Sequence, residues 1–189
     1  MKKLVPIAMS NRHIHLSEKD LATLFGEGYE LTKMKDLSQP GQFACEEKVD
    51  VYGPKNAIKG VRILGPTRPE TQLEVSVADS FVLGIAPPVR DSGDIKDSPG
   101  VTLEGPKGKV EIMQGAIVAS RHIHMHTDDA EKFGLKDKDE VQVKVDGKRG
   151  LIFSNVLVRV SDKYALEMHV DVEEGNAAGV KNGQMVEII

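Results

Sequence analysis

Two His-x-His pairs are the residues of this chain best suited to hold a metal ion. His13 and His15 lie in the segment Ser-Asn-Arg-His-Ile-His, and His122 and His124 lie in Ser-Arg-His-Ile-His, 109 positions later. Each pair follows a short apolar run that is typical of a strand. Because residues i and i+2 of a strand point to the same face, each pair would direct two imidazoles at one point. The duplication favours a metal site over two chance pairs of surface histidines.

Two further residues complete the predicted ligand sets. His169 lies in the segment Tyr164–Asp171, which resembles Thr71–Asp79, and Glu74 lies in that earlier segment. Imidazoles and carboxylates suit zinc, and a catalytic zinc ion keeps three protein ligands and an open position. Six ligands are enough for two such ions, although iron, manganese or cobalt would suit the same residues. Taken singly, His169 is equally well explained as a buried core histidine and Glu74 as a surface carboxylate.

Arginines and one more histidine near these motifs have simpler explanations when taken alone. Arg68, in the turn Gly-Pro-Thr-Arg-Pro-Glu, would suit bidentate capture of a phosphate beside a cation, but a surface arginine is the simpler interpretation. The same holds for Arg90. His126 is expected at the exposed start of a helix rather than on a metal. Arg12 and Arg121 are expected to point away from the neighbouring histidines.

The rest of the chain is predicted to be mainly β. Short segments rich in Val, Ile and Leu are separated by Gly, Pro, Asp and Asn, and Asp146-Gly147 is typical of a hairpin turn. Many short strands with few helices indicate closed β-barrels rather than a doubly wound sheet. The expected strands are Lys48–Tyr52, Gly60–Leu64, Gln72–Val77, Val110–Met113, Glu140–Val145, Gly150–Phe153, Val156–Val160, Ala165–Val170 and Met185–Ile189.

A short capped helix is predicted after each His-x-His pair. Ser17 is a good N-cap for a helix that Gly26 ends, and the segment from Thr127 to Gly134 repeats this pattern. The chain therefore reads as an internal duplication, with one β-barrel in residues 1–105 and a similar one in residues 106–189. The turn-rich segment 91–108 is either the linker between them or a binding loop.

Composition limits the classes of function. The chain has 189 residues, 40% of them hydrophobic, which is enough to bury a core, and its net charge of −4 argues against a broad nucleic-acid-binding surface. No apolar run approaches the roughly 18 residues of a membrane span. The single cysteine, Cys45, excludes an internal disulfide and is expected to be a small buried side chain rather than a nucleophile. These features favour a cytoplasmic protein.

Several motifs in order along the chain resemble the PduL-type phosphotransacylases (phosphate propanoyltransferases). They are Ser-Asn-Arg-His-Ile-His-Leu-Ser, Gly-Pro-Thr-Arg-Pro-Glu-Thr-Gln-Leu-Glu-Val-Ser, Arg-Asp-Ser-Gly-Asp and Ala-Ser-Arg-His-Ile-His-Met. The resemblance implies two β-barrels with capping helices and a two-zinc site. It also implies reversible transfer of a short acyl group, acetyl or propionyl, between coenzyme A and inorganic phosphate.

The resemblance also assigns roles to residues. It implies Arg68 as the catalytic, phosphate-binding arginine, and Arg90 and Ser92 near the substrate pocket. One departure is His126, which stands where serine or threonine is expected. Members targeted to microcompartments carry an added N-terminal amphipathic helix, and the first strand here is expected within a few residues of Met1, so a free cytosolic enzyme is favoured. The metal ligands that the resemblance implies are His13, His15, Glu74, His122, His124 and His169.

Other functions stay open at this point. A metal-dependent hydrolase of thioesters could use the same ligands, although the barrel of binuclear amidohydrolases needs about 250 residues. A non-catalytic zinc-binding protein would need no role for Arg68. The sequence does not distinguish acetyl from propionyl substrates, since one methylene is worth only about 1–3 kcal/mol in a pocket. It is equally compatible with a monomer and with a homo-oligomer.

Overall fold

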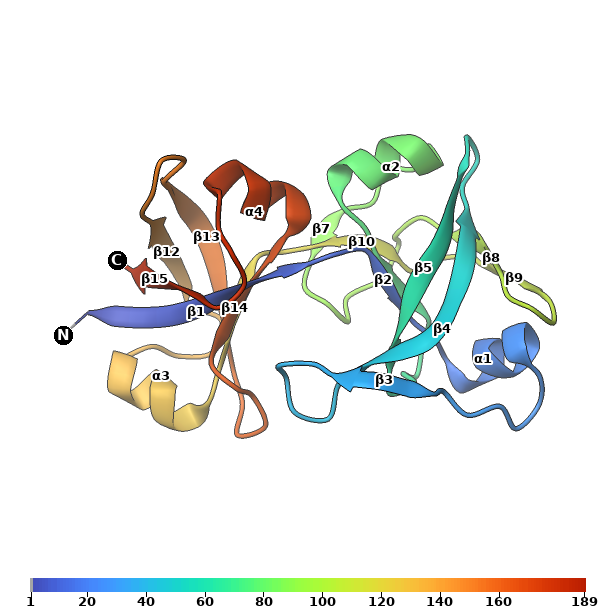
Figure 1. Cartoon of the computed structure of the whole chain (residues 1–189), viewed down its shortest axis with the longest axis horizontal. Coiled ribbons are helices and arrows are strands. Elements are labelled where there is room, and N and C mark those ends of the chain that lie inside the picture. The colour runs from blue at the N-terminus through green and yellow to red at the C-terminus, as the bar shows by residue number, and fades with distance from the viewer. Residues whose placement is uncertain (1) are drawn as a thin grey trace. The chain divides into compact units, whose positions relative to one another are not determined.

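The computed structural model describes residues 2–189, in which fifteen strands and four short helices form a mainly β fold (Figure 1). The predicted fold class is therefore confirmed. The chain divides into two compact units. The barrel unit contains the chain up to Asn11, Ser38–Pro40 and Ser120–Ile189, and the sheet unit contains Arg12–Leu37 and Gly41–Ala119.

A closed six-stranded barrel forms the barrel unit. Strand β1 runs parallel to β14 and antiparallel to β15, and its pairing with β14 begins at Ile7. Pro6 lacks an N–H group, and the ladder with β14 starts directly after it, whereas the ladder with β15 already starts at Lys3 and includes Pro6 opposite Met185. In order around the barrel the strands are β1 (Lys3–Ser10), β14 (Glu167–Asp171), β11 (His122–Met125), β13 (Leu151–Val160), β12 (Glu140–Val145) and β15 (Gln184–Ile188).

The sheet unit has nine strands whose order does not close. The unit is therefore a half-barrel rather than the second closed barrel that the sequence predicts. Its edge strand β7 (Val89–Arg90) has only two residues because turn formers follow it at once. The order is β7, β10 (Ala116–Ala119), β6 (Gln72–Glu74), β2 (His13–His15), β5 (Ala57–Gly65), β4 (Phe43–Tyr52), β8 (Val101–Glu104) and β9 (Lys109–Ile112), with β3 (Lys33–Asp36) paired to β4.

Each unit has its own aliphatic core. In the barrel unit Ile7, Ile123 and Met168 are fully buried, and in the sheet unit Ile14 and Leu73 are. Ile14 and Ile123 are the middle residues of the two His-x-His motifs. The alternation of a strand therefore packs the isoleucine into the core and leaves the two flanking histidines on the opposite face.

The two halves of the sequence exchange a strand. Strand β1 leads directly into β2 but pairs with β14, whereas β10 leads into β11 but pairs with β6. For this reason the compact units are interleaved in the sequence and do not follow a single division between residues 105 and 106. That division remains a proposal about an ancestral duplication.

Two of the four helices form where local sequence patterns predicted them. Helix α1 (Glu18–Phe25) has Ser17 as its N-cap and ends at Gly26, as predicted. Helix α3 (Thr127–Phe133) also forms, with the His126 ring accepting a hydrogen bond from the backbone of Asp128.

Two further helices were not expected: α2 (Val77–Leu83) and α4 (Val172–Ala178). Each begins with a capping box directly after a short strand, so the expected strand Gln72–Val77 ends early at Glu74. The expected strands Gly150–Phe153 and Val156–Val160 are parts of the single strand β13. In residues 2–189, no helix is long and apolar enough to cross a membrane.

Candidate metal centres and a phosphate-binding network

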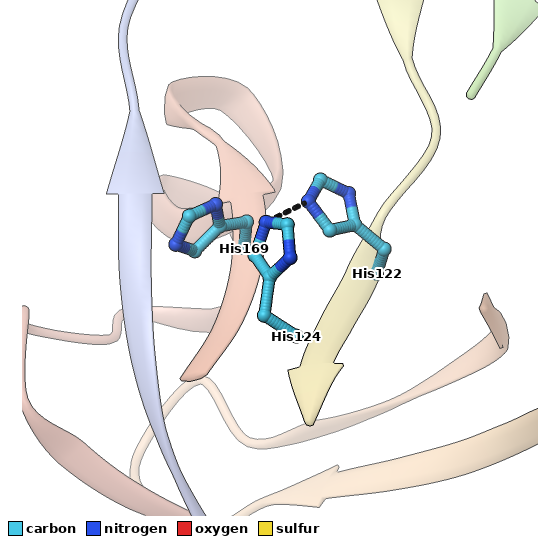
Figure 2. A group of neighbouring side chains, drawn as sticks. All are labelled: His122, His124 and His169. Carbon is cyan, nitrogen blue, oxygen red and sulfur yellow. Dashed lines mark hydrogen bonds between the residues drawn. The ribbon is translucent and has the colours of Figure 1, made fainter. Parts of the chain in front are cut away.

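Three histidines of the barrel unit converge on one point. His122 and His124 lie on β11, and antiparallel pairing places His169 of β14 directly opposite His122. One ring nitrogen from each lies within 4.8 Å of those of the other two. Figure 2 shows the three rings gathered beside the strands that carry them. We call these three residues the barrel cluster.

The contacts of the barrel cluster suit a cation. Nε2 of His122 and Nε2 of His124 are 3.1 Å apart, and the Nδ1–H of His122 donates to the Ser120 carbonyl at 2.7 Å. That bond leaves a lone pair on Nε2 of His122. Burial, together with His122 and His169, lowers the pKa of His124 to about 2, so its ring is a neutral ligand at neutral pH. The Nδ1 of His124 is buried without a hydrogen-bond partner in the part of the chain that the structure describes.

A carboxylate and a hydroxyl lie beside His169. The Oε2 of Glu167 is 2.7 Å from Nε2 of His169, and the hydroxyl of Ser38 donates to the same oxygen. Burial acts to raise the pKa of Glu167, but the hydrogen bonds from His169 and Ser38 outweigh it and lower that pKa. Glu167 is thus an anion that contacts one member of the barrel cluster.

The sheet unit repeats this arrangement with a different third residue. His13 and His15 lie on β2, and β6 places Glu74 opposite His13 and Gln72 opposite His15. Nε2 of His13 is 3.4 Å from a carboxylate oxygen of Glu74, and the two histidine rings meet edge to face. We call His13, His15 and Glu74 the sheet-unit trio. Among residues 2–189, the barrel cluster is the one group of His, Cys, Asp or Glu side chains in which ligand atoms from three residues all lie within 4.8 Å of one another.

A hydrogen-bond network surrounds Glu74. The Ser92 hydroxyl donates to Oε1 of Glu74 at 2.7 Å, and the Gln72 amide donates to the same oxygen at 2.7 Å. Arg68 donates to the Ser92 oxygen at 3.2 Å, and the backbone N–H of Gly93 donates to the Gln72 carbonyl at 2.7 Å. A guanidinium, a hydroxyl and a carboxylate are therefore held together by short polar contacts.

The lowered pKa values of Glu74 and His15 determine the charges of this network at neutral pH. Burial acts to raise the pKa of Glu74, but His13, Ser92, His15 and Arg68 outweigh it and lower that pKa to about 2. Burial first, and then the charge of Arg68, lower the pKa of His15 to about 3. At neutral pH the trio offers an ionised carboxylate and a neutral His15, which are the protonation states in which these groups bind metals.

The structure brings most of the predicted site residues into these two groups but not all of them. Arg68 and Ser92 join the sheet-unit trio. Arg90 instead forms an ion pair with Asp94 at 3.0 Å. The ring of His126 caps α3, at the helix start where the sequence predicted it.

The arginines of the two motifs brace the helices that follow the ligand strands. Nε of Arg12 lies 2.9 Å from each of the two carboxylate oxygens of Asp79. Nε of Arg121 lies 2.8 Å from Oε1 of Glu174. Asp79 and Glu174 are the third residues of α2 and α4 and close their capping boxes. Each arginine therefore ties its His-x-His strand to the helix that begins after the opposing strand.

Sequence reasoning gave no role to four of these residues: Gln72, Glu167, Asp79 and Glu174. A signal for the first two was present, since Gln72 and Glu167 each precede a predicted ligand by two positions and so share its strand face. The other two could have been found as N3 carboxylates of capping boxes, Ser76-x-x-Asp79 and Asp171-x-x-Glu174.

Fold and site define a β-barrel protein that presents a histidine cluster able to hold a metal ion. Neutral imidazoles, a buried ring nitrogen without a partner and a hydrogen-bonded outer carboxylate fit such an ion. An arginine–serine–carboxylate network accompanies the second, related trio.

Comparison with known proteins identifies the family. Residues 6–181 match the family model of phosphate propanoyltransferase. A phosphate propanoyltransferase of Thermotoga maritima is 56% identical over 97% of this chain and 88% of its own length. A phosphate propanoyltransferase of Rhodopseudomonas palustris is 55% identical over 97% of this chain and 81% of its own length. A phosphate propanoyltransferase of Clostridioides difficile is 49% identical over 98% of this chain and 88% of its own length. The chain belongs to the phosphate propanoyltransferase family and is a phosphate acyltransferase.

Proposed function

We propose that this enzyme reversibly transfers an acetyl or propionyl group between coenzyme A and inorganic phosphate, with one zinc ion at the barrel cluster and one at the sheet-unit trio. The observation that carries the proposal is the contact of Arg68 with Ser92 and of Ser92 with Glu74. It brings Arg68, the arginine proposed to bind phosphate, close to a predicted metal ligand. Both belong to the sheet unit, so this support depends on one compact unit alone.

Arg68 would hold the phosphate. Its planar guanidinium can donate two parallel hydrogen bonds to two phosphate oxygens, and this fixes their orientation as well as their charge. The hydroxyl of Ser92 already donates to Glu74 and accepts from Arg68 and from the amide of Gln72. Ser92 therefore serves to hold the arginine relative to the carboxylate, and the proposed substrate role of Arg90 has no comparable support from its pairing with Asp94.

The reaction would be a direct displacement. A phosphate oxygen forms a bond to the thioester carbonyl carbon, the carbon–sulfur bond breaks, and the sulfur leaves with the electron pair as the coenzyme A thiolate. Because thiols have a pKa of about 8.5, this leaving group needs no strong general acid. Arg68 would stabilise negative charge as the tetrahedral species forms.

An acyl-enzyme on cysteine finds no support. Cys45 is fully buried in the core of the sheet unit, and burial raises the pKa of its thiol to about 11. A buried, protonated thiol is a poor nucleophile. Direct attack by phosphate is therefore the favoured mechanism. Separately, the free buried cysteine agrees with the proposed cytosolic location.

Bound zinc would supply positive charge that orients phosphate or polarises the thioester carbonyl. The residues proposed to hold it are His13, His15 and Glu74 in one unit and His122, His124 and His169 in the other. Local positive charge at these sites and at Arg68 would outweigh the net charge of −4 when anionic coenzyme A binds.

Thiol release from acetyl-CoA and propionyl-CoA, with zinc-loaded protein and with or without phosphate, tests this function. We expect release that requires phosphate and falls about 100- to 1,000-fold in Arg68→Ala, with metal content unchanged. Arg149→Ala is the matched control, because Arg149 is an exposed arginine that donates to the Ala177 carbonyl. Release without phosphate would establish a thioester hydrolase instead. Metal binding without thiol release from either substrate would favour a non-catalytic zinc protein.

A further inference from the structure

The barrel cluster has a polar partner on its own strand. Glu167 and His169 are two residues apart on β14, so their side chains share a face, and the carboxylate Oε2 lies 2.7 Å from Nε2 of His169. The side chain of Glu167 is 14% exposed and that of His169 is 22% exposed. A hydrogen bond to a charged acceptor that is mostly withdrawn from water is stronger than one on the surface.

A separate segment holds this carboxylate in place. The hydroxyl of Ser38 donates to the same Oε2 that contacts His169. The next residue, Gln39, is 3% exposed and exchanges two hydrogen bonds with the backbone of Ala165, at 3.0 and 3.2 Å. Ala165 lies two positions before Glu167, so the segment Ser38–Pro40 is fixed to the chain that leads into β14.

We propose that Glu167 is a positioning residue that orients His169 for metal binding and that Ser38 in turn orients Glu167. The Nε2–H of His169 donates to the carboxylate, and the lone pair of Nδ1 is then the one available to the ion. This inference rests on the proposed metal-dependent function and extends it to two residues outside the ligand set.

The sheet unit supports the assignment independently. Gln72 occupies the register position that matches Glu167, since Gln72 lies opposite His15 and Glu167 lies opposite His124. Gln72 donates its amide to Glu74 at 2.7 Å. A ligand carboxylate needs a donor beside it and a ligand imidazole needs an acceptor, and the two matching positions carry a donor and an acceptor respectively.

A role for Glu167 as a fourth ligand is less well supported. The ligand atoms that lie within 4.8 Å of one another belong to His122, His124 and His169, and among residues 2–189 no carboxylate oxygen joins them at that distance. The contacts from His169 and from Ser38 both end on Oε2 of Glu167, as expected for an oxygen that accepts two hydrogen bonds.

Zinc affinity, measured by competition with a chromophoric chelator in the absence of coenzyme A and phosphate, tests the proposal. We expect the barrel-cluster ion to bind about 10- to 100-fold more weakly than in wild type in Glu167→Ala, and more weakly by a smaller factor in Ser38→Ala. Glu140→Gln, which changes an exposed carboxylate on β12 of the same barrel, is the control and should bind like wild type.

The protonated nitrogen of His169 gives a second readout that needs no activity. Nitrogen-15 NMR of the metal-free protein should show the proton on Nε2 in wild type and a mixture of both tautomers in Glu167→Ala. Unchanged zinc affinity together with an unchanged tautomer would overturn the proposal. So would X-ray absorption that counts Glu167 among the ligands of the ion.

These measurements separate the two hypotheses. A Glu167 effect on zinc binding in a protein without phosphate-dependent turnover would contradict the proposed function alone. Normal turnover with no effect of Glu167 on zinc or tautomer would contradict the positioning role alone.

Discussion

The two His-x-His strand pairs share a backbone frame and differ in one ligand. In both, an antiparallel strand places a polar residue opposite the first histidine, which is Glu74 opposite His13 and His169 opposite His122. The supporting residues change with the ligand. Gln72 and Ser92 donate to the carboxylate, whereas Glu167 accepts from the imidazole.

This difference shows how one frame can give two electrostatic environments. The sheet-unit trio contains an ionised carboxylate, and the barrel cluster contains three imidazoles. Counted over the ligands alone, the trio carries about one more negative charge than the barrel cluster, while the anion Glu167 lies beside the barrel cluster and the cation Arg68 belongs to the network of the trio. The choice of side chain at one register position therefore sets the charge of the ligand set, and the neighbouring residues set the rest.

The largest expected effect comes from removing that distinguishing ligand in each unit. Glu74→Gln and His169→Gln should each lose one zinc ion per chain and lower turnover by more than about 100-fold, because a ligand contributes more than its outer partners do. Metal analysis after gel filtration and steady-state thiol release would measure both quantities.

Glu70→Gln is the control for this pair, since Glu70 is an exposed carboxylate in the same turn as Arg68. If either ligand variant kept two ions and full turnover, the two regions would not be equivalent metal sites.

The second prediction concerns acid stability of the metal-free protein. The pKa of His15 is about 3 and that of His124 is about 2, both below the ordinary 6.5, so the unfolded chain binds more protons than the folded one between these values. Stability is therefore highest above pH 6.5 and falls as pH decreases. Each histidine should lower the free energy of unfolding by roughly 2 kcal/mol between pH 7 and pH 5.

Urea unfolding in the presence of a chelator at the two pH values would measure this fall. His15→Gln should halve the fall in the free energy of unfolding between pH 7 and pH 5, and His124→Gln should do the same, because the two histidines contribute about equally to it. Glu74 adds to the loss only below pH 4.5, since its own pKa is lowered to about 2. A free energy of unfolding that is flat from pH 7 to pH 5 would contradict the buried, neutral state of both rings.

The smallest expected effect comes from breaking the two ion pairs Arg12–Asp79 and Arg121–Glu174. Arg12→Ala should lower the free energy of unfolding by about 2 kcal/mol and Arg121→Ala by about 1 kcal/mol, because each leaves a carboxylate without its arginine. The larger value belongs to Arg12, since the side chain of Asp79 is 7% exposed and that of Glu174 is 20% exposed. Urea unfolding at pH 7, with Arg149→Ala as the control, would rank them, and the reverse order would show that burial of the carboxylate is not decisive.

Local patterns were enough to predict much of the molecule. Ser17 and Gly26 mark the ends of α1, and the alternation around Ile14 and Ile123 places the histidines on one strand face. The grouping of His122, His124 and His169 also follows from motif and repeat. The helix caps and the strand faces depend on residues that are close in sequence, whereas His169 is 45 positions beyond His124 and is assigned to the pair through the internal repeat and the family resemblance.

Pairing between distant strands could not be predicted in the same way. Nothing local to Lys3–Ser10 shows that it pairs with β14 and β15, and nothing near Ser38 shows that it contacts Glu167. The half-barrel form of the sheet unit depends likewise on which strands meet across long loops. Such choices are made by the packing of the whole core, which periodicity does not record.

The exchange of β1 has a consequence for synthesis on the ribosome. Lys3 of β1 lies opposite Ile188 of β15, so β1 pairs with a strand that is synthesised 185 positions later. The sheet unit, from Arg12 to Ala119, is translated completely before β14 and β15 exist. The sheet unit can therefore fold first, while β1 remains an unpaired strand, open to aggregation, until β14 and β15 have been made.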